Sequence, residues 1–293
     1  MSKETDLIGA MRKLAHHPAA RGLADDCAVL DFGEEALVLT HDMMVEGIHW
    51  LPGQDMADVA WKLVATNLSD LAAKGAQPVG VLLGFMLGDQ DDRFVEGLGK
   101  ALDAFGVPLL GGDTVSANGP RSLGLTALGR ATCRPVPDRA GASAGDTLWI
   151  TGPVGAAMLG FEALESGSGT EDESAAFRRP VPRLAQGRSL APVVTAMMDV
   201  SDGLLIDAAR MADASAVTFA IDSTALPFPA ALPQARRDEA MRWGDDYELL
   251  FAMPPAATPP VAAHRIGKAV ARGPSSVLID GTAPRGNLGY MHD

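Results

Sequence analysis

The order of strand-like and helix-like segments constrains the fold of this chain more than any other feature. Apolar runs of strand length predict strands at residues 27–31, 35–41, 79–87, 123–130, 146–151, 217–222, 247–253 and 275–280. Apolar residues at helical spacing predict helices at roughly 4–15, 56–74, 91–105, 154–165, 183–197 and 203–213. Because the two kinds of segment do not alternate strictly, this order favours an α+β fold over a doubly wound parallel sheet.

A chain of 293 residues is long enough for two domains, each with its own core. The segment 133–146 carries two prolines and two glycines between strand-like runs, and it is the best candidate for a domain boundary. We therefore expect an N-terminal domain at 1–137 and a C-terminal domain at 138–293. The segments 166–174 and 253–260 are polar or proline-rich, and we expect both to be loops.

The net charge of −13 argues against nucleic acid or an anionic membrane surface as a partner, since either needs a clustered basic face. Cys27 and Cys133 have no metal-binding or disulfide spacing, so neither a disulfide framework nor a zinc site is indicated, and a reducing cytoplasm fits best. Charged residues interrupt the first apolar stretch, so it does not resemble a signal peptide. The longest apolar run, 79–88, is well short of the ~18 residues of a membrane helix.

Aspartates recur at the ends of apolar segments. They are Asp25, Asp26, Asp42, Asp70, Asp113, Asp199 and Asp202. Two carboxylates about 4 Å apart repel by roughly 4 kcal/mol near a protein surface, so a convergent group needs protons or a bound cation. Oxygen ligands without paired His or Cys suit Mg²⁺ or Ca²⁺, and Mg²⁺ normally arrives with substrate phosphates. Near Gly203, Ser201 or Asp202 is expected to cap a helix whose N-terminus can face an anion.

Two stretches allow both a structural and a functional interpretation. Gly111 and Gly112 in "PLLGGDTVS" are typical turn residues, and a turn is the favoured interpretation of the stretch taken alone. In the helix that Asp55 is expected to cap, Asn67, Asp70 and Lys74 lie on one narrow arc beside the apolar stripe. This arc is either a solvated flank or the side of the helix that carries Asp70 into a site. Phosphate-binding loops and kinase signatures of the common kinds are absent from the sequence.

Seven stretches, in order, resemble the thiamine-monophosphate kinase family: "LADDCAVL", "THDMMVEGIHW", "NLSDLAAKGAQP", "LLGGDT", "RAGASAGD", "MDVSDGL" and "GDDYEL". The family belongs to the aminoimidazole-ribonucleotide-synthetase-like superfamily. The resemblance implies an N-terminal α/β domain whose sheet pairs with that of a second subunit, a C-terminal α+β domain, and a homodimer. It also implies that ATP, with several Mg²⁺ ions, phosphorylates thiamine monophosphate to thiamine diphosphate.

The resemblance also implies the site residues. The metal positions are Asp26, Thr40, His41, Asp42, Asp70, Asp113, Asp199 and Asp202. The nucleotide positions are Phe105, Gly112, Asp113, Arg139 and Ser201, and the substrate positions are His49, Asp245 and Tyr290. The chain departs from the family pattern at "LADD", where Gly-x-Gly-Asp-Asp is usual, at His41, where Thr is usual, and at Asp245, where Glu is usual.

The implied acceptor is a phosphate that is already ionised, so no general base is required. The protein is expected to align donor and acceptor for in-line transfer and to neutralise charge with metal, with Asp113 and Asp202 in catalytic positions. The sequence leaves two alternatives open. The chain is another ATP-using member of the superfamily, or a non-catalytic nucleotide or metal sensor that has kept the fold.

Overall fold

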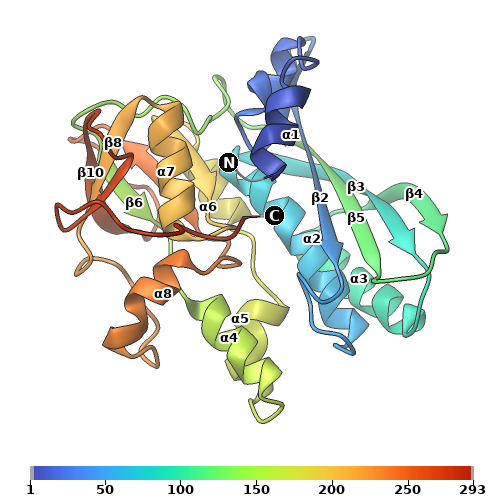
Figure 1. Ribbon diagram of the computed structural model, residues 1–293. Helices are drawn as coiled ribbons and strands as arrows, with labels where there is room; N and C mark the ends of the chain where they lie inside the picture. The colour runs from blue at the N-terminus through green and yellow to red at the C-terminus, as the bar shows by residue number, and fades with distance from the viewer. Residues whose placement is uncertain (1–2, 292–293) are drawn as a thin grey trace.

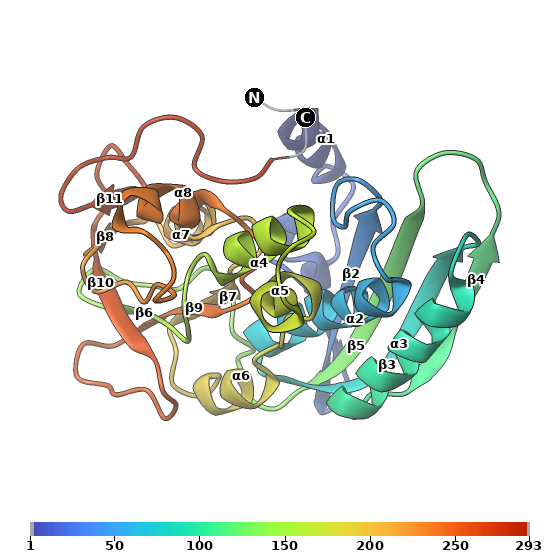
Figure 2. The same ribbon diagram turned by 90° about the horizontal axis from the view of Figure 1, so that it is seen from below.

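The computed structural model describes residues 3–291, which form two sheets with separate cores (Figure 1). The first sheet has the order β1-β2-β5-β3-β4, and its strands are β1 (Ala28–Phe32), β2 (Glu35–Val45), β3 (Ala76–Met86), β4 (Leu109–Val115) and β5 (Ser122–Ala131). All neighbouring strands are antiparallel except β3 and β4. Helices α2 (Met56–Ala73) and α3 (Asp91–Phe105) cover one face of this sheet, as Figure 2 shows.

The second sheet has the order β11-β8-β10-β6-β9-β7. Its strands are β6 (Thr147–Ile150), β7 (Ala196–Asp199), β8 (Val217–Ile221), β9 (Leu249–Met253), β10 (His264–Ala271) and β11 (Val277–Ile279). The helices of this half are α4 (Ala156–Glu165), α5 (Glu171–Arg178), α6 (Leu184–Leu190), α7 (Leu204–Ala214), α8 (Arg237–Arg242) and the short 3₁₀ turn η2 (Gln234–Arg236). Helix α1 (Lys3–Met11) and the 3₁₀ turn η1 (Pro18–Leu23) precede the first sheet. Two mixed sheets with helices confirm the α+β prediction.

Helix α2 lies at the centre of the molecule and joins the two halves. As expected from the sequence, Asp55 caps it by accepting a hydrogen bond from the Ala57 N–H at 3.0 Å. The body of the helix packs in the first core, and its last turn packs in a separate apolar cluster with residues of α6, β7 and β9. Apolar burial therefore fixes the last turn of α2 against the end of the second sheet.

Three local predictions were wrong, and two elements were not predicted. Gly111 and Gly112 lie within β4, paired with Leu82 and Leu83, and do not form a turn after it. The expected loop at 166–174 contains the start of α5, which Thr170 and Glu173 begin with a reciprocal capping box. The expected helix at 183–197 ends at Leu190, and the following apolar residues form β7. Strand β10 and helix α8 were not predicted at all.

No helix among residues 3–291 has the length and hydropathy that crossing a lipid bilayer requires.

Candidate active site

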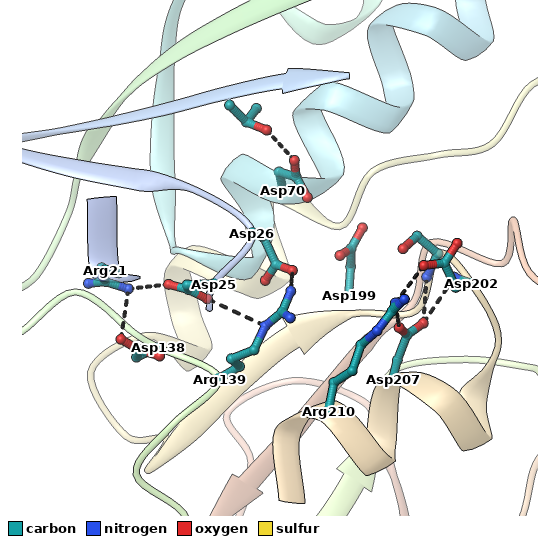
Figure 3. A network of polar contacts seen from close by, with 12 residues as sticks. Arg21, Asp25, Asp26, Asp70, Asp138, Arg139, Asp199, Asp202, Asp207 and Arg210 are labelled. Carbon is teal, nitrogen blue, oxygen red and sulfur yellow. Dashed lines mark hydrogen bonds and ion pairs between the residues drawn. The ribbon is translucent and has the colours of Figure 1, made fainter. Parts of the chain in front are cut away.

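Three aspartates from separate segments meet where the two halves of the molecule adjoin. Asp26 precedes β1, Asp70 lies in the last turn of α2, and Asp199 ends β7. One carboxylate oxygen from each lies within 4.8 Å of the other two. Figure 3 shows the three side chains around a common space. Three of the eight metal positions that the resemblance implies are therefore neighbours in the structure.

This acidic cluster lacks compensating positive charge on one side. Among residues 3–291, no Lys, Arg or His forms an ion pair with Asp42, Asp70 or Asp199; Asp70 and Asp199 accept hydrogen bonds from Thr40 Oγ1 and Ser69 Oγ instead. Burial, followed by the neighbouring carboxylates, raises the pKa of Asp42 to about 6 and holds that of Asp70 well above its usual value. Burial and Asp26 raise the pKa of Asp199 to about 8. Oxygen donors that are costly to ionise without a cation fit a site for Mg²⁺.

Side chains of α2 position the segments that carry these carboxylates. Asn67 Oδ1 accepts a hydrogen bond from the Asp42 N–H at 3.0 Å, and Ser69 Oγ donates to Asp199 at 2.6 Å. Asn67, Asp70 and Lys74 follow one another at spacings of three and four, which places them on the same side of the helix. Asn67 and Lys74 are fully buried, so the arc is not a solvated flank but faces the candidate site.

The Asp26 end of the cluster is basic. Lys74 Nζ lies 2.5 Å from Asp25 Oδ1 and 3.0 Å from Asp26 Oδ2, and Arg139 donates to Asp26 Oδ1. Arg21 pairs with Asp25 (Figure 3). Burial by itself raises the pKa of Asp26, but Lys74 and Arg139 together outweigh it and hold that pKa well below the usual value. Arg139, an expected nucleotide contact, thus lies against a metal position.

The loop between β7 and α7 is shaped by an aspartate inside the helix. The N–H groups of Ser201 and Asp202 donate to Asp207 Oδ2 at 3.1 and 3.0 Å, and Arg210 pairs with both Asp202 and Asp207. The expected cap was therefore wrong: neither Ser201 nor Asp202 caps α7, whose N-cap residue is Gly203. The side chain of Asp202 is left at the edge of the cluster, where it is about one third exposed.

Hydrogen bonds join two of the three expected substrate positions to Lys62 and the third to the loop that carries Asp202. Lys62 of α2 donates to Asp245 Oδ2 at 2.8 Å and to the carbonyl oxygen of His49 at 3.0 Å. Its ammonium group also lies 3.6 Å from the centroid of the Phe177 ring. The Tyr290 N–H donates to the carbonyl oxygen of Asp202 at 2.9 Å, which places the C-terminal segment over the loop that carries Asp202.

Asp113 lies away from the cluster within one chain. Across the first sheet, Met43 of β2 is paired with Gly124 of β5, Gly124 with Gly84 of β3, and Gly84 with Asp113 of β4. Three strand spacings of about 4.8 Å separate Asp113 from β2 by about 14 Å. Because side chains alternate along a strand, Asp113 projects with Met43 from the outer face, opposite to the face on which Thr40 reaches Asp70.

The remaining expected residues also lie outside the cluster. His41 is on the outer face of β2, where its ring nitrogen lies 2.8 Å from Thr126 Oγ1. Gly112 is required by close packing, because a Cβ there would lie 2.0 Å from the Leu83 carbonyl oxygen. Phe105 packs on Trp61 with ring centroids 5.0 Å apart. Trp61 precedes Asp70 by nine positions, or about 13 Å along α2.

Sequence reasoning missed four residues that shape the site: Lys62, Ser69, Asp207 and Arg210. It placed Lys74 on the arc beside Asp70 but gave it no role. For Ser69 and Lys74 a signal was available, since both lie within the "NLSDLAAKGAQP" stretch that carries the resemblance. Asp207 and Arg210 follow Asp202 in the first turns of a helix, a position from which side chains commonly reach back to a preceding loop.

Both halves of the chain match known families. Residues 24–131 match the AIR synthase related protein, N-terminal domain, and residues 143–279 match the AIR synthase related protein, C-terminal domain. The chain is 36% identical over 249 residues to the thiamine-monophosphate kinase of Escherichia coli (strain K12), covering 80% of this chain and 76% of that protein. It is 36% identical over 306 residues to the thiamine-monophosphate kinase of Caulobacter vibrioides, covering 94% of this chain and 86% of that protein.

A solved structure is similar along the whole chain. AaThiL complexed with AMPPCP and TMP superposes with a TM-score of 0.89 at 25% identity, covering 98% of this chain and 97% of that one. The two-sheet arrangement is therefore shared with a protein that has been crystallised with those two ligands.

Proposed function

The chain belongs to the thiamine-monophosphate kinase family, and on this premise we propose that it transfers the γ-phosphoryl group of ATP to thiamine monophosphate, giving thiamine diphosphate and ADP. The relatives of that name and the ligands bound to AaThiL support the choice of substrates. The observation within this chain that carries the proposal is the cluster of Asp26, Asp70 and Asp199 at the junction of the two halves.

The transfer is direct and in line. An oxygen of the acceptor phosphate forms the new bond to the γ-phosphorus while the bond from that phosphorus to the bridging oxygen of ADP breaks. The acceptor oxygen is ionised at neutral pH, so no proton has to be removed and no base is required. The work of the protein is to align the two phosphates and to place positive charge around them.

Mg²⁺ supplies that charge when bound, by neutralising the phosphate oxygens that both substrates bring to the cleft. Asp26, Asp70 and Asp199 would hold it, with Asp42 and Thr40 beside them. Asp202 stands next to the transferring group, on the loop that Asp207 and Arg210 hold. Asp245 meets the thiamine cation, and His49 and Tyr290 lie beside it.

A second copy of the chain completes the site. The outer face of the first sheet has no helix over it within residues 3–291 and exposes Met43, Leu82 and Val115. Exposed apolar faces and unpaired edge strands are typical of interfaces. A homodimer that covers this face and the β4 edge brings Gly112, Asp113 and His41 of one copy to the nucleotide held by the other.

Product formation tests the proposal. Purified protein with ATP, Mg²⁺ and thiamine monophosphate is expected to form thiamine diphosphate and ADP in equal amounts. Tight ATP binding with no thiamine diphosphate formed would contradict the proposal and favour the nucleotide sensor. ATP consumption only with a different phosphorylated acceptor would favour another member of the superfamily.

A further inference from the structure

The two sides of the acidic cluster differ in what balances their charge. Asp25 and Asp26 face protein cations, namely Arg21, Lys74 and Arg139. On the other side, among residues 3–291, Asp70 and Asp199 accept side-chain hydrogen bonds only from hydroxyl groups, and no cation pairs with Asp42. The negative charge that a divalent ion would balance is therefore that of Asp42, Asp70 and Asp199.

Lys74 is buried and has an acceptor for each of its three N–H donors. The residue is fully buried at the C-cap of α2. Its ammonium group has three donors, and the structure gives it three acceptors: Asp25 Oδ1 at 2.5 Å, Asp26 Oδ2 at 3.0 Å and the Met197 carbonyl oxygen at 3.5 Å. These acceptors belong to the segment just before β1 and to β7, so the Lys74 side chain connects α2 to both.

We propose that the Lys74 ammonium group occupies the place of a divalent cation beside Asp25 and Asp26, so that this residue sets how many metal ions the active site binds. A lysine ammonium is a compact point charge and is the side chain closest to a small cation in this respect. Asp26 then has two sets of partners. Lys74 and Arg139 pair with it on one side, and the ion held by Asp70 and Asp199 binds it on the other. The inference rests on the proposed function, since it takes that ion as given.

The variant Lys74→Met tests this inference, because it removes the charge and keeps an unbranched side chain of similar volume. Two buried carboxylates are then left with one fewer cation, and they provide oxygen ligands for a divalent ion. Lys62→Met is the matched control: Lys62 is also buried on α2 and paired with an aspartate, Asp245, but lies away from the cluster. The double variant Lys74→Met/Asp25→Asn removes one charge of each sign.

Mn²⁺ is the probe, counted from the electron paramagnetic resonance signal of the free ion, with melting temperatures measured in EDTA and in Mn²⁺. Lys74→Met is expected to bind one more Mn²⁺ per chain than the wild type, to melt lower in EDTA, and to recover in Mn²⁺. The double variant is expected to return to the wild-type count. Lys62→Met is expected to melt lower without recovery in Mn²⁺.

An unchanged Mn²⁺ count in Lys74→Met would overturn the inference. So would a variant that stays unfolded in Mn²⁺ while Lys62→Met folds, because a divalent ion would then not replace the ammonium group. Absence of Mn²⁺ binding to the wild type and to both single variants would contradict the proposed metal site itself, which distinguishes the two failures.

Discussion

Ser69 donates its hydroxyl hydrogen to Asp199 across the junction of the two halves, with 2.6 Å between the oxygens. Both residues are buried, Ser69 in α2 and Asp199 at the end of β7. The bond fixes the orientation of a carboxylate in one half by a side chain in the other. The geometry of the cluster therefore depends on how the halves are docked.

Ser69→Ala is expected to lower the affinity of the site for a divalent metal ion. Residues that orient a metal ligand typically change the metal affinity by about 10- to 100-fold when they are removed, and Asp199 would also lose a buried hydrogen bond that stabilises its ionised form. The dissociation constant for Mn²⁺, measured by titration calorimetry, is the readout. Ser189→Ala, in which an exposed serine is removed, is the control and should leave that constant unchanged. Equal affinities for the wild type and Ser69→Ala would show that Ser69 does not position Asp199.

Asp113→Asn is expected to lower the rate of transfer by about 100-fold or more while leaving the melting temperature in EDTA nearly unchanged. The melting temperature should hold because Asp113 is exposed on β4 in a single chain and its side chain makes no hydrogen bond or ion pair with residues 3–291. Steady-state kinetics and thermal melting are the two measurements. Asp103→Asn, on the exposed side of α3, is the control.

Mixing variants tests whether Asp113 acts across a dimer. An Asp113→Asn chain and an Asp70→Asn chain, each inactive alone, should regain activity when they are unfolded and refolded together, because a mixed dimer then contains one intact site. If Asp113 served the cluster of its own chain, the mixture would stay inactive.

Asp245→Asn is expected to raise the KM for thiamine monophosphate by roughly tenfold and to leave the KM for ATP unchanged. The carboxylate of Asp245 is about one quarter exposed and is held by Lys62 and by the Tyr247 hydroxyl. Loss of one charge-assisted contact to a cationic ring corresponds to about 1 to 2 kcal/mol. The two KM values, compared with those of Asp238→Asn on the surface, are the measurement. A higher KM for ATP alone would remove Asp245 from the acceptor site.

The free energy of unfolding is expected to decrease as pH rises, because of Asp246. This carboxyl accepts the N–H groups of Gly155 and Ala157 at the start of α4, yet burial dominates and raises its pKa from 3.8 to about 7. Below about pH 4 both the folded and unfolded states bind the proton. As pH rises toward 7 only the unfolded state releases it, which lowers the free energy of unfolding by at most roughly 4 kcal/mol.

Asp246→Asn should remove this contribution, so the variant is expected to gain stability relative to the wild type between pH 5 and 8. Urea unfolding at each pH measures the difference, with Asp238→Asn as a control for an exposed carboxylate. A constant difference across this range would show that Asp246 is ionised in the folded protein throughout.

The sequence predicted the architecture to a useful extent because its local signals are strong. The cap at Asp55, the amphipathic α3 and most apolar strands were all expected. The errors have local causes. The strand β7 was merged into a helix because its residues "AMMD" continue the apolar pattern of α6. The start of α5 was missed although Thr170 and Glu173 form the T-x-x-E capping pattern.

Only part of the site could be predicted from the sequence. The resemblance supplied Asp26, Asp70 and Asp199, but their convergence depends on the packing of α2 against β7 and β9, which no local pattern encodes. The pairing of Asp26 with Arg139 joins residues 113 positions apart. The domain boundary at 137/138, the cytoplasmic location and the homodimer stay predictions.

The stereochemistry of transfer tests the central claim most directly. ATP made chiral at its γ-phosphorus with three oxygen isotopes is incubated with the protein, Mg²⁺ and thiamine monophosphate, and the configuration of the terminal phosphate of the product is determined. A single in-line displacement predicts thiamine diphosphate that carries this phosphorus with inverted configuration. Retained configuration, which requires two displacements, or label found only in free phosphate would contradict direct transfer.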